Sequence, residues 1–183
     1  MKPLYTISKG FLSKEECDLI VASFSMNNIG FVMITEKGDK DVVRNQYIPE
    51  IRTCDLSNFD TSHFVFEKAR RKFMELKAAY GLSDLGGIAY NFVRYREGGK
   101  FAKHTDAYEN MIGSHRQLSM SVQLTNTHEG GQFVIYKPGT DEPKYPKLEQ
   151  GDALLFKSTL MHEVQPITKG ERYALVLWFM TKE

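Results

Sequence analysis

From about Gly87 to its end, the chain alternates short apolar stretches with turn residues, and this texture limits the possible folds more than any other feature. Glycine and proline interrupt the pattern every few residues, as at Gly98, Gly131 and Gly139. The stretches between the breaks have the length and composition of β-strands. Many short antiparallel strands at close spacing predict a sandwich or jelly roll rather than alternating α/β units. We expect strands near residues 88–96, 101–104, 117–125, 132–137, 152–157 and 172–180.

One predicted strand, residues 117–124, has a complete alternation of apolar and polar side chains. Leu, Met, Val and Leu lie on one side, and Gln, Ser, Ser and Gln on the other. Alternation of this kind is typical of a half-exposed strand with water against its polar side. It is equally compatible with a strand whose polar side lines the mouth of a barrel. The pattern alone leaves both interpretations open.

The first part of the chain contributes two predicted helices. Ser13 and Glu16 have the spacing of a capping box, in which each residue satisfies a free backbone N–H at a helix start. This predicts a helix that runs to about Ser25. Apolar residues recur every three or four positions over 62–80 and predict a second helix. Residues 36–50 are polar and indicate a connection without regular structure.

The chain has 183 residues, of which 42% are hydrophobic and 26% charged, so it has material for a core and a hydrated surface. No linker interrupts it. We therefore expect one domain over residues 1–183, in which 1–86 is a supporting segment and 87–183 is the jelly-roll core. The predicted class is mostly β, of the α+β type, with both helices packed on one outer face.

Charge and composition argue against several classes of protein. Lys and Arg number 24 against 23 Asp and Glu, which leaves a formal net charge of +1. This balance does not favour a nucleic-acid or membrane partner, since both attract a large basic excess. No apolar stretch approaches the ~20 residues that span a bilayer, and the N-terminus lacks the apolar run of a secretion signal. Two cysteines, Cys17 and Cys54, are too few for a disulfide framework, so a cytoplasmic location is expected.

His104-Thr105-Asp106 is the candidate for a chemically active motif, because the other common motifs are missing from the sequence. The chain has five histidines but no Cys-x-x-Cys, no His-Glu-x-x-His, no phosphate loop and no dinucleotide glycine motif. On an extended segment, residues two apart point to the same side, so this imidazole and carboxylate can reach one ion. With a third ligand from a distant strand, they would make the two-histidine, one-carboxylate site that holds Fe(II).

His162 is the candidate for the third ligand, because it follows directly after a predicted apolar strand. Ten residues later, Arg172 opens the segment 172–179, which is apolar on both faces and therefore buried on both. A guanidinium that enters a dry interior needs an anion, and its planar fork suits a carboxylate. A salt bridge to a protein carboxylate, or a position in solvent at the strand mouth, is the alternative.

The order of these pieces resembles the Fe(II)- and 2-oxoglutarate-dependent oxygenases, in particular the prolyl-4-hydroxylase-like branch with a double-stranded β-helix (jelly roll) fold. The resemblance covers most of the chain and is closest from Tyr90 onward. Any single piece would be weak evidence, but the ordered set is specific. The matching segments are 10–17, 95–106, 116–124, 129–132, 151–156, 162–166 and 170–172.

The resemblance implies roles for individual residues. His104, Asp106 and His162 would bind the iron. Arg172 would hold the distal carboxylate of 2-oxoglutarate, whose other carboxylate and keto group chelate the metal. Tyr95 would hydrogen-bond the same cosubstrate, although a tyrosine that only packs in a strand is the alternative.

Three further positions are less certain in their roles. Gln123 lies where some relatives carry a second tyrosine for the cosubstrate, and whether Gln123 contacts it is open. Arg116 and Trp178 match positions near the substrate entrance and in the site wall; a surface arginine and a packing tryptophan are the alternatives. The remaining histidines are expected to be structural or exposed: His63, His115 and His128.

The implied activity is hydroxylation of a C–H bond, above all in a peptidyl proline, with release of succinate and CO2. Related halogenases lack the carboxylate that Asp106 provides, so its presence favours hydroxylation. The resemblance implies Fe(II), 2-oxoglutarate and O2, with ascorbate as a further cofactor and a protein or peptide as partner. The sequence does not indicate the oligomeric state, and the substrate would be held by loops such as 36–50, 107–116 and 138–147.

Two alternatives to this activity remain open. One is a nucleic-acid demethylating dioxygenase, against which the balanced charge and the spacing of Arg172 speak. The other is a non-enzymatic jelly roll that binds a metal or ligand without turnover. An intact set of two histidines, one aspartate and one arginine makes that second alternative the weaker one.

Overall fold

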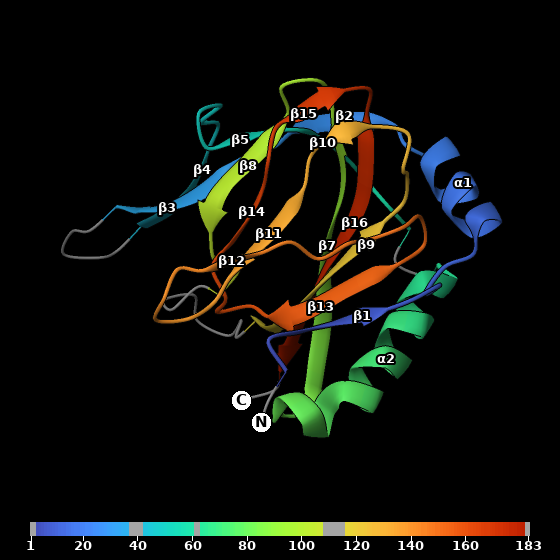
Figure 1. Cartoon of the computed structure of the whole chain (residues 1–183), viewed down its shortest axis with the longest axis vertical. Coiled ribbons are helices and arrows are strands. Elements are labelled where there is room, and N and C mark those ends of the chain that lie inside the picture. The colour runs from blue at the N-terminus through green and yellow to red at the C-terminus, as the bar shows by residue number, and fades with distance from the viewer. Residues whose placement is uncertain (1–2, 37–41, 61–62, 108–115, 182–183) are drawn as a thin grey trace.

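Two antiparallel sheets dominate the computed structural model, which describes residues 3–36, 42–60, 63–107 and 116–181 (Figure 1). Within these residues the larger sheet has seven strands, the smaller sheet has five, and two further strand pairs lie beside them. The larger sheet, in spatial order, consists of β1 (Tyr5–Ser8), β13 (Ala153–Lys157), β9 (Arg116–Gln123), β16 (Arg172–Thr181), β7 (Leu85–Tyr95), β6 (Asp55–Ser57) and β2 (Met26–Ile29). The smaller sheet consists of β12 (Pro143–Lys144), β11 (Phe133–Tyr136), β14 (His162–Val164), β8 (Lys100–His104) and β5 (Arg52–Thr53). The two pairs are β10 (Glu129–Gly130) with β15 (Ile167–Lys169), and β3 (Val32–Glu36) with β4 (Val42–Gln46).

Both predicted helices form, and local residues define their ends. The helix α1 (Lys14–Ala22) starts with the capping box: the Ser13 hydroxyl accepts from the Glu16 N–H at 3.2 Å, and the Glu16 carboxylate accepts from the Ser13 N–H at 2.8 Å. The helix α2 (Phe64–Tyr80) ends at Gly81, which has φ 62° in the left-handed region that favours glycine. The first helix stops earlier than expected because the chain turns into β2 soon after it.

The two helices cover one face of the larger sheet, as predicted, and lie together at one side of the molecule in Figure 1. Apolar side chains of both helices and of the sheet form the core between them. It includes Cys17, Ile20, Phe73, Tyr80, Phe92, Met120, Leu177 and Phe179. A second core fills the space between the two sheets and includes Tyr95, Phe133, Ile135, Leu154, Phe156 and Ala174. The strand β16 contributes to both cores, so the prediction that it is buried on both faces is confirmed.

The polar side of β9 faces the interior rather than water. Ser119, Ser121 and Gln123 are 0%, 2% and 5% exposed. The alternation over residues 117–124 therefore marks a strand whose polar side lines a buried site between the sheets. Buried hydroxyl and amide groups of this kind need hydrogen-bond partners, and those partners are functional candidates.

The strands expected from Gly87 onward are present as β7, β8, β9, β11, β13 and β16, with ends shifted by a few residues. The interpretation of 36–50 as an irregular connection is wrong in part, because β4 pairs with β3 in an antiparallel hairpin. Asn45 and Gln46 on β4 are exposed. The sequence over 36–50 is rich in polar residues and shows no alternation, so no pattern marks β4 as a strand. His115 and most of the loop 107–116 lie outside the described residues. No helix in the described ranges is both long enough and apolar enough to cross a bilayer.

Candidate metal centre

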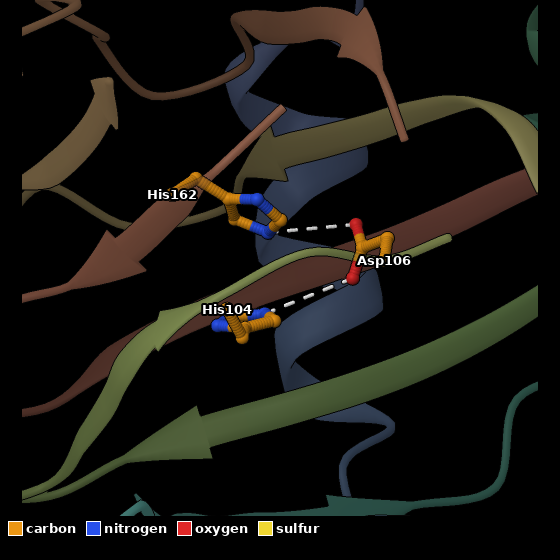
Figure 2. Close-up of side chains that lie close together, drawn as sticks. All are labelled: His104, Asp106 and His162. Atoms are coloured by element: carbon orange, nitrogen blue, oxygen red, sulfur yellow. Dashed lines mark ion pairs between the residues drawn. The ribbon is translucent and has the colours of Figure 1, made fainter. Parts of the chain in front are cut away.

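The smaller sheet brings His104, Asp106 and His162 together, although 58 positions separate the two histidines in the sequence. His104 ends β8 and His162 begins β14, and the two residues are direct partners in the antiparallel register. Asp106 lies two residues after His104, and one ligand atom from each side chain lies within 4.8 Å of the others. Figure 2 shows both imidazoles turned toward the carboxylate of Asp106.

Both imidazoles are oriented by backbone carbonyls. The Nδ1 atom of His104 lies 2.7 Å from the Ala102 carbonyl oxygen, and that of His162 lies 2.8 Å from the Leu160 carbonyl oxygen. Because a carbonyl only accepts, Nδ1 carries the proton in each ring, and Nε2 presents a lone pair. The Nε2 atoms lie 3.7 Å and 3.5 Å from the Asp106 oxygens. These distances exceed those of hydrogen bonds.

The carboxylate of Asp106 is held by the polar side of β9. The Ser119 hydroxyl donates to Asp106 Oδ2 at 2.7 Å, and Ser119 in turn lies 2.9 Å from the Ser158 hydroxyl. The Asp106 N–H donates to the Ser158 carbonyl at 2.9 Å. The polar side of the alternating strand thus fixes one carboxylate oxygen and leaves Oδ1 for another partner.

The pKa values of His104 and Asp106 are both lowered by their surroundings. Burial, followed by the neighbouring His162, lowers the pKa of His104 to about 3. Burial acts to raise the pKa of Asp106, but His162, His104 and the bond from Ser119 outweigh it, so that pKa lies below its ordinary value. The two Nε2 atoms, whose rings hold Nδ1 against backbone carbonyls, and the Asp106 carboxylate face one another as electron-pair donors. A divalent cation fits this set, and two histidines with one carboxylate suit Fe(II).

Arg172 lies in the same interior space and is 2% exposed. Its Nε donates to the Gln123 Oε1 at 3.0 Å, while its Nη2 is buried with no hydrogen-bond partner among the described residues. Burial lowers the pKa of Arg172, and a guanidinium keeps its proton in proteins. No ion pair within the described ranges includes Arg172, so the alternative of a salt bridge to a protein carboxylate finds no partner there. A buried cation is costly unless an anion pairs with it, so an anionic ligand would stabilise Arg172.

Tyr95 and Gln123 flank Arg172. Tyr95 is 2% exposed, its ring centre lies 5.6 Å from the Arg172 guanidinium carbon, and burial raises its pKa to about 12. Gln123 donates through Nε2 to the Thr125 carbonyl at 2.5 Å, which turns its Oε1 toward Arg172. Among the described residues, Gln123 therefore contacts the arginine itself. A small cavity of about 30 Å³ adjoins Tyr95, Arg172 and the three candidate ligands.

A larger cavity of about 380 Å³ adjoins two of the candidate ligands, His104 and Asp106. Arg116 and Trp178 both line it, and the Arg116 guanidinium carbon lies 4.0 Å from the Trp178 ring centre. Trp178 is 7% exposed and lines the small cavity as well. It therefore belongs to the wall of the site as well as to the packing of β16.

Two contributors were not singled out from the sequence. Ser119, which holds Asp106, lies on the polar side of an alternating strand, so a signal for it existed. Arg52, a second buried arginine, lines both cavities from the two-residue strand β5, and no periodicity marks so short an element. Of the remaining histidines, His63 caps α2 through Nδ1 and His128 is half-buried, 3.5 Å from Gln123 Nε2.

Comparison with known proteins gives the same picture. Residues 90–180 match the model of the 2OG-Fe(II) oxygenase superfamily. A PKHD-type hydroxylase of Alteromonas mediterranea is 37% identical over 97 residues, covering 49% of this chain and 42% of the relative. One from Pseudomonas putida strain F1 is 35% identical over 91 residues, covering 46% and 39%. The chain thus spans about two-fifths of the length of these curated relatives.

Solved structures extend the likeness to nearly the whole chain. The crystal structure of a Pseudomonas putida prolyl-4-hydroxylase has a TM-score of 0.68 at 18% identity, covering 97% of this chain and 92% of that one. A viral collagen prolyl hydroxylase from Paramecium Bursaria Chlorella virus-1, in its 2OG complex, has a TM-score of 0.64 at 19% identity, covering 98% and 97%. At this identity the match concerns the fold, and the prediction of a jelly roll is confirmed.

Proposed function

Residues 90–180 of this chain belong to the 2OG-Fe(II) oxygenase superfamily, and from this premise we propose that the protein hydroxylates a C–H bond, with release of succinate and CO2. We propose a peptidyl proline as the substrate. The observation that carries the proposal is the juxtaposition of three electron-pair donors, His104, Asp106 and His162, with a buried and unpaired Arg172 beside the same cavity.

In this proposal His104, Asp106 and His162 hold Fe(II). When bound, the metal supplies the activation of O2 that couples oxidation of 2-oxoglutarate to oxidation of the substrate. The residues of the chain supply position: the carbonyls of Ala102 and Leu160 keep both Nε2 atoms unprotonated and aimed at the ion. Three protein ligands leave further coordination positions for the cosubstrate and oxygen.

Arg172 binds the distal carboxylate of 2-oxoglutarate. Gln123 takes up Nε of the guanidinium and fixes its plane, so that the terminal nitrogens are free for the ligand. Tyr95 lines the same space and offers its hydroxyl as a further donor to the cosubstrate. Each charge-assisted hydrogen bond contributes about 1.5–3 kcal/mol, and the walls of the cavity exclude water that would compete for the carboxylate.

The substrate enters through the larger cavity beside Trp178 and Arg116. Its volume of about 380 Å³ suits one residue of a chain rather than a folded surface. One structural relative at 18% identity is a prolyl hydroxylase from Trichoplax adhaerens, solved with a hypoxia inducible factor peptide fragment, which supports a peptide as the substrate class. Ascorbate, as a reductant that sustains turnover, and a cytoplasmic location are parts of the proposal; both cysteines are buried and free.

Succinate formation tests the proposal. The protein is incubated with Fe(II), 2-oxoglutarate, ascorbate and either proline-containing peptides or methylated DNA, and succinate and oxidised substrate are measured by mass spectrometry. We expect peptide-dependent succinate and a gain of one oxygen on the peptide. Demethylation of DNA would assign the other enzyme activity, and binding of metal without any succinate would indicate a non-enzymatic jelly roll.

A further inference from the structure

A second buried arginine lies on the substrate side of the candidate metal centre. Arg52 is 6% exposed and lines the larger cavity together with His104, Asp106 and Trp178. It comes from β5, which pairs with β8, the strand that carries His104. The position of Arg52 is therefore set by the same sheet that sets the candidate ligands.

The hydrogen bonds of Arg52 leave part of its guanidinium unused. Nη1 donates to the Phe31 carbonyl at 3.0 Å, and Nη2 donates to the Asn91 amide oxygen at 3.2 Å when that amide is turned to face it. Nε is buried and has no hydrogen-bond partner among the described residues. A guanidinium has five N–H donors, and these two bonds use one donor on each terminal nitrogen. The side chain of Cys54 lies beside the guanidinium, but it supplies no carboxylate.

No carboxylate of the described chain neutralises Arg52 directly. No ion pair within the described residues includes it, and its guanidinium carbon lies 4.6 Å from the centre of the Phe101 ring. Phe101 in turn stacks on the His104 imidazole, with ring centres 3.5 Å apart. The nearest acid in the cavity wall is Asp106, which faces the two imidazoles and is bonded by Ser119.

The charges in the wall of the larger cavity are mostly positive. Its described lining contains Arg52, Lys103 and Arg116 as cations and Asp106 as an acid. Lys103 already pairs with Asp141 at 3.1 Å, and its side chain is 37% exposed. Arg52, by contrast, is a buried cation whose Nε–H has no hydrogen-bond partner among the described residues. Burial of such a group is costly unless an anion completes it.

We infer that Arg52 forms a carboxylate-binding subsite in the larger cavity, and that the substrate carries a carboxylate close to the carbon that is hydroxylated. This inference rests on the proposed function. The planar fork of arginine matches a carboxylate in geometry. The carboxylate of the substrate is either an acidic side chain beside the target residue or the C-terminal carboxylate of a peptide. Arg172 serves the cosubstrate from the small cavity, and Arg52 serves the substrate from the large one.

The test uses matched peptides and a metal that does not turn over. The full chain is loaded with Zn(II) and 2-oxoglutarate, and emission of Trp178, the sole tryptophan, reports binding in the cavity that it lines. The peptides are N-acetylated tetrapeptides with proline followed or preceded by glutamate or by glutamine, and proline peptides that end in a free carboxylate or an amide. We expect one acidic probe to bind about tenfold or more tightly than its neutral partner. The pair that shows the preference identifies a side-chain or a terminal carboxylate.

Variants assign the preference to a residue. In Arg52→Gln the acidic and neutral probes should bind equally, and in Arg52→Lys the preference should shrink, because the charge remains and the fork is lost. Lys103→Gln removes a positive charge from the same wall and should keep the preference. The comparison of peptides in the wild type needs no variant, so the test stands even if Arg52→Gln does not fold.

Several results would overturn the inference. Equal affinity of all matched pairs for the wild type, or no peptide binding to protein that binds Zn(II) and 2-oxoglutarate, would exclude a carboxylate subsite while leaving the cosubstrate site intact. A preference that survives in Arg52→Gln would assign it elsewhere. If Arg52→Gln weakens 2-oxoglutarate as strongly as Arg172→Gln does, the anion belongs to the cosubstrate. Failure to bind Zn(II) and 2-oxoglutarate at all would instead overturn the proposed function.

Discussion

The two buried arginines of the site, Arg172 and Arg52, are held through different nitrogens of their guanidinium groups. Arg172 is held through Nε by Gln123, and its Nη2 has no partner. Arg52 is held through both terminal nitrogens by Phe31 and Asn91, and its Nε has no partner. Both lack a carboxylate partner among the described residues, and both line the small cavity beside the candidate ligands.

We infer that this difference assigns the two arginines to two anions of similar chemistry, the cosubstrate and the substrate. A guanidinium held at Nε presents its terminal nitrogens end-on, the geometry for a bidentate carboxylate in a narrow space. A guanidinium held at its terminal nitrogens has one N–H left on each, and these N–H groups remain for a carboxylate of the substrate. The first arrangement suits one invariant cosubstrate, and the second suits a group on a variable substrate.

Asp106→Ala removes the carboxylate of the candidate metal centre beside the two arginines. It should abolish metal-dependent binding of 2-oxoglutarate and all turnover, and should lower metal affinity by more than the roughly 10–100-fold that loss of an outer-shell partner costs. Metal titration by calorimetry and succinate assays measure both effects, with circular dichroism to establish that the domain folds. Full activity in this variant would refute the ligand assignment.

Arg172→Gln should weaken 2-oxoglutarate on the order of a hundredfold, because it removes charge-assisted bonds of ~1.5–3 kcal/mol each. Metal affinity should change little. The matched control is Arg52→Gln, which should leave the dissociation constant of 2-oxoglutarate within about threefold of the wild type. Titration of 2-oxoglutarate into Zn(II)-loaded protein measures both variants. Equal losses in the two would erase the distinction between the arginines.

Gln123→Leu tests whether Gln123 positions the guanidinium of Arg172. Removing the acceptor of Arg172 Nε leaves that N–H buried and the guanidinium plane free, so 2-oxoglutarate should bind about threefold to tenfold more weakly. The peptide preference attributed to Arg52 should not change. Calorimetry with both ligands tests this pair of statements, and an unchanged cosubstrate affinity would show that Gln123 does not position Arg172.

Within the site, His104 should contribute to the pH response of the metal-free protein, whereas the arginines stay charged throughout. His104 has a pKa of about 3 in the folded state against 6.5 ordinarily. Between these two values the unfolded chain binds a proton at His104 and the folded protein does not. Acid therefore favours unfolding. Between pH 6.5 and 5.5 the wild type should lose about 1 kcal/mol more unfolding free energy than His104→Gln. Urea denaturation with a chelator present measures this difference, and equal losses would contradict the assigned burial of His104.

The sequence predicted those parts of the fold in which burial imposes a period. The strand 172–179 is apolar on both faces, so both the strand and the burial of Arg172 could be inferred. The polar side of 117–124 was visible as a pattern, but whether it faced water or the interior depends on the second sheet. Only the structure supplies that sheet, because its strands come from distant parts of the chain.

Arg52 could not be inferred in the same way. A strand of two residues has no period, and its burial results from the packing of β5 against β8 and of Phe31 and Asn91 around the guanidinium. The hairpin β3–β4 was missed because residues 36–50 are rich in polar side chains and show no alternation. The juxtaposition of His104 with His162 was predicted through resemblance, and local spacing alone gave no means to pair them.

The most direct test is an anaerobic crystal structure of the full chain with Fe(II), 2-oxoglutarate and the preferred acidic peptide. The account predicts one metal ion bonded to His104 Nε2, His162 Nε2 and Asp106, with the cosubstrate carboxylate on Arg172 and the peptide carboxylate on Arg52. A metal ion bound elsewhere, or 2-oxoglutarate with its distal carboxylate on Arg52, would contradict it.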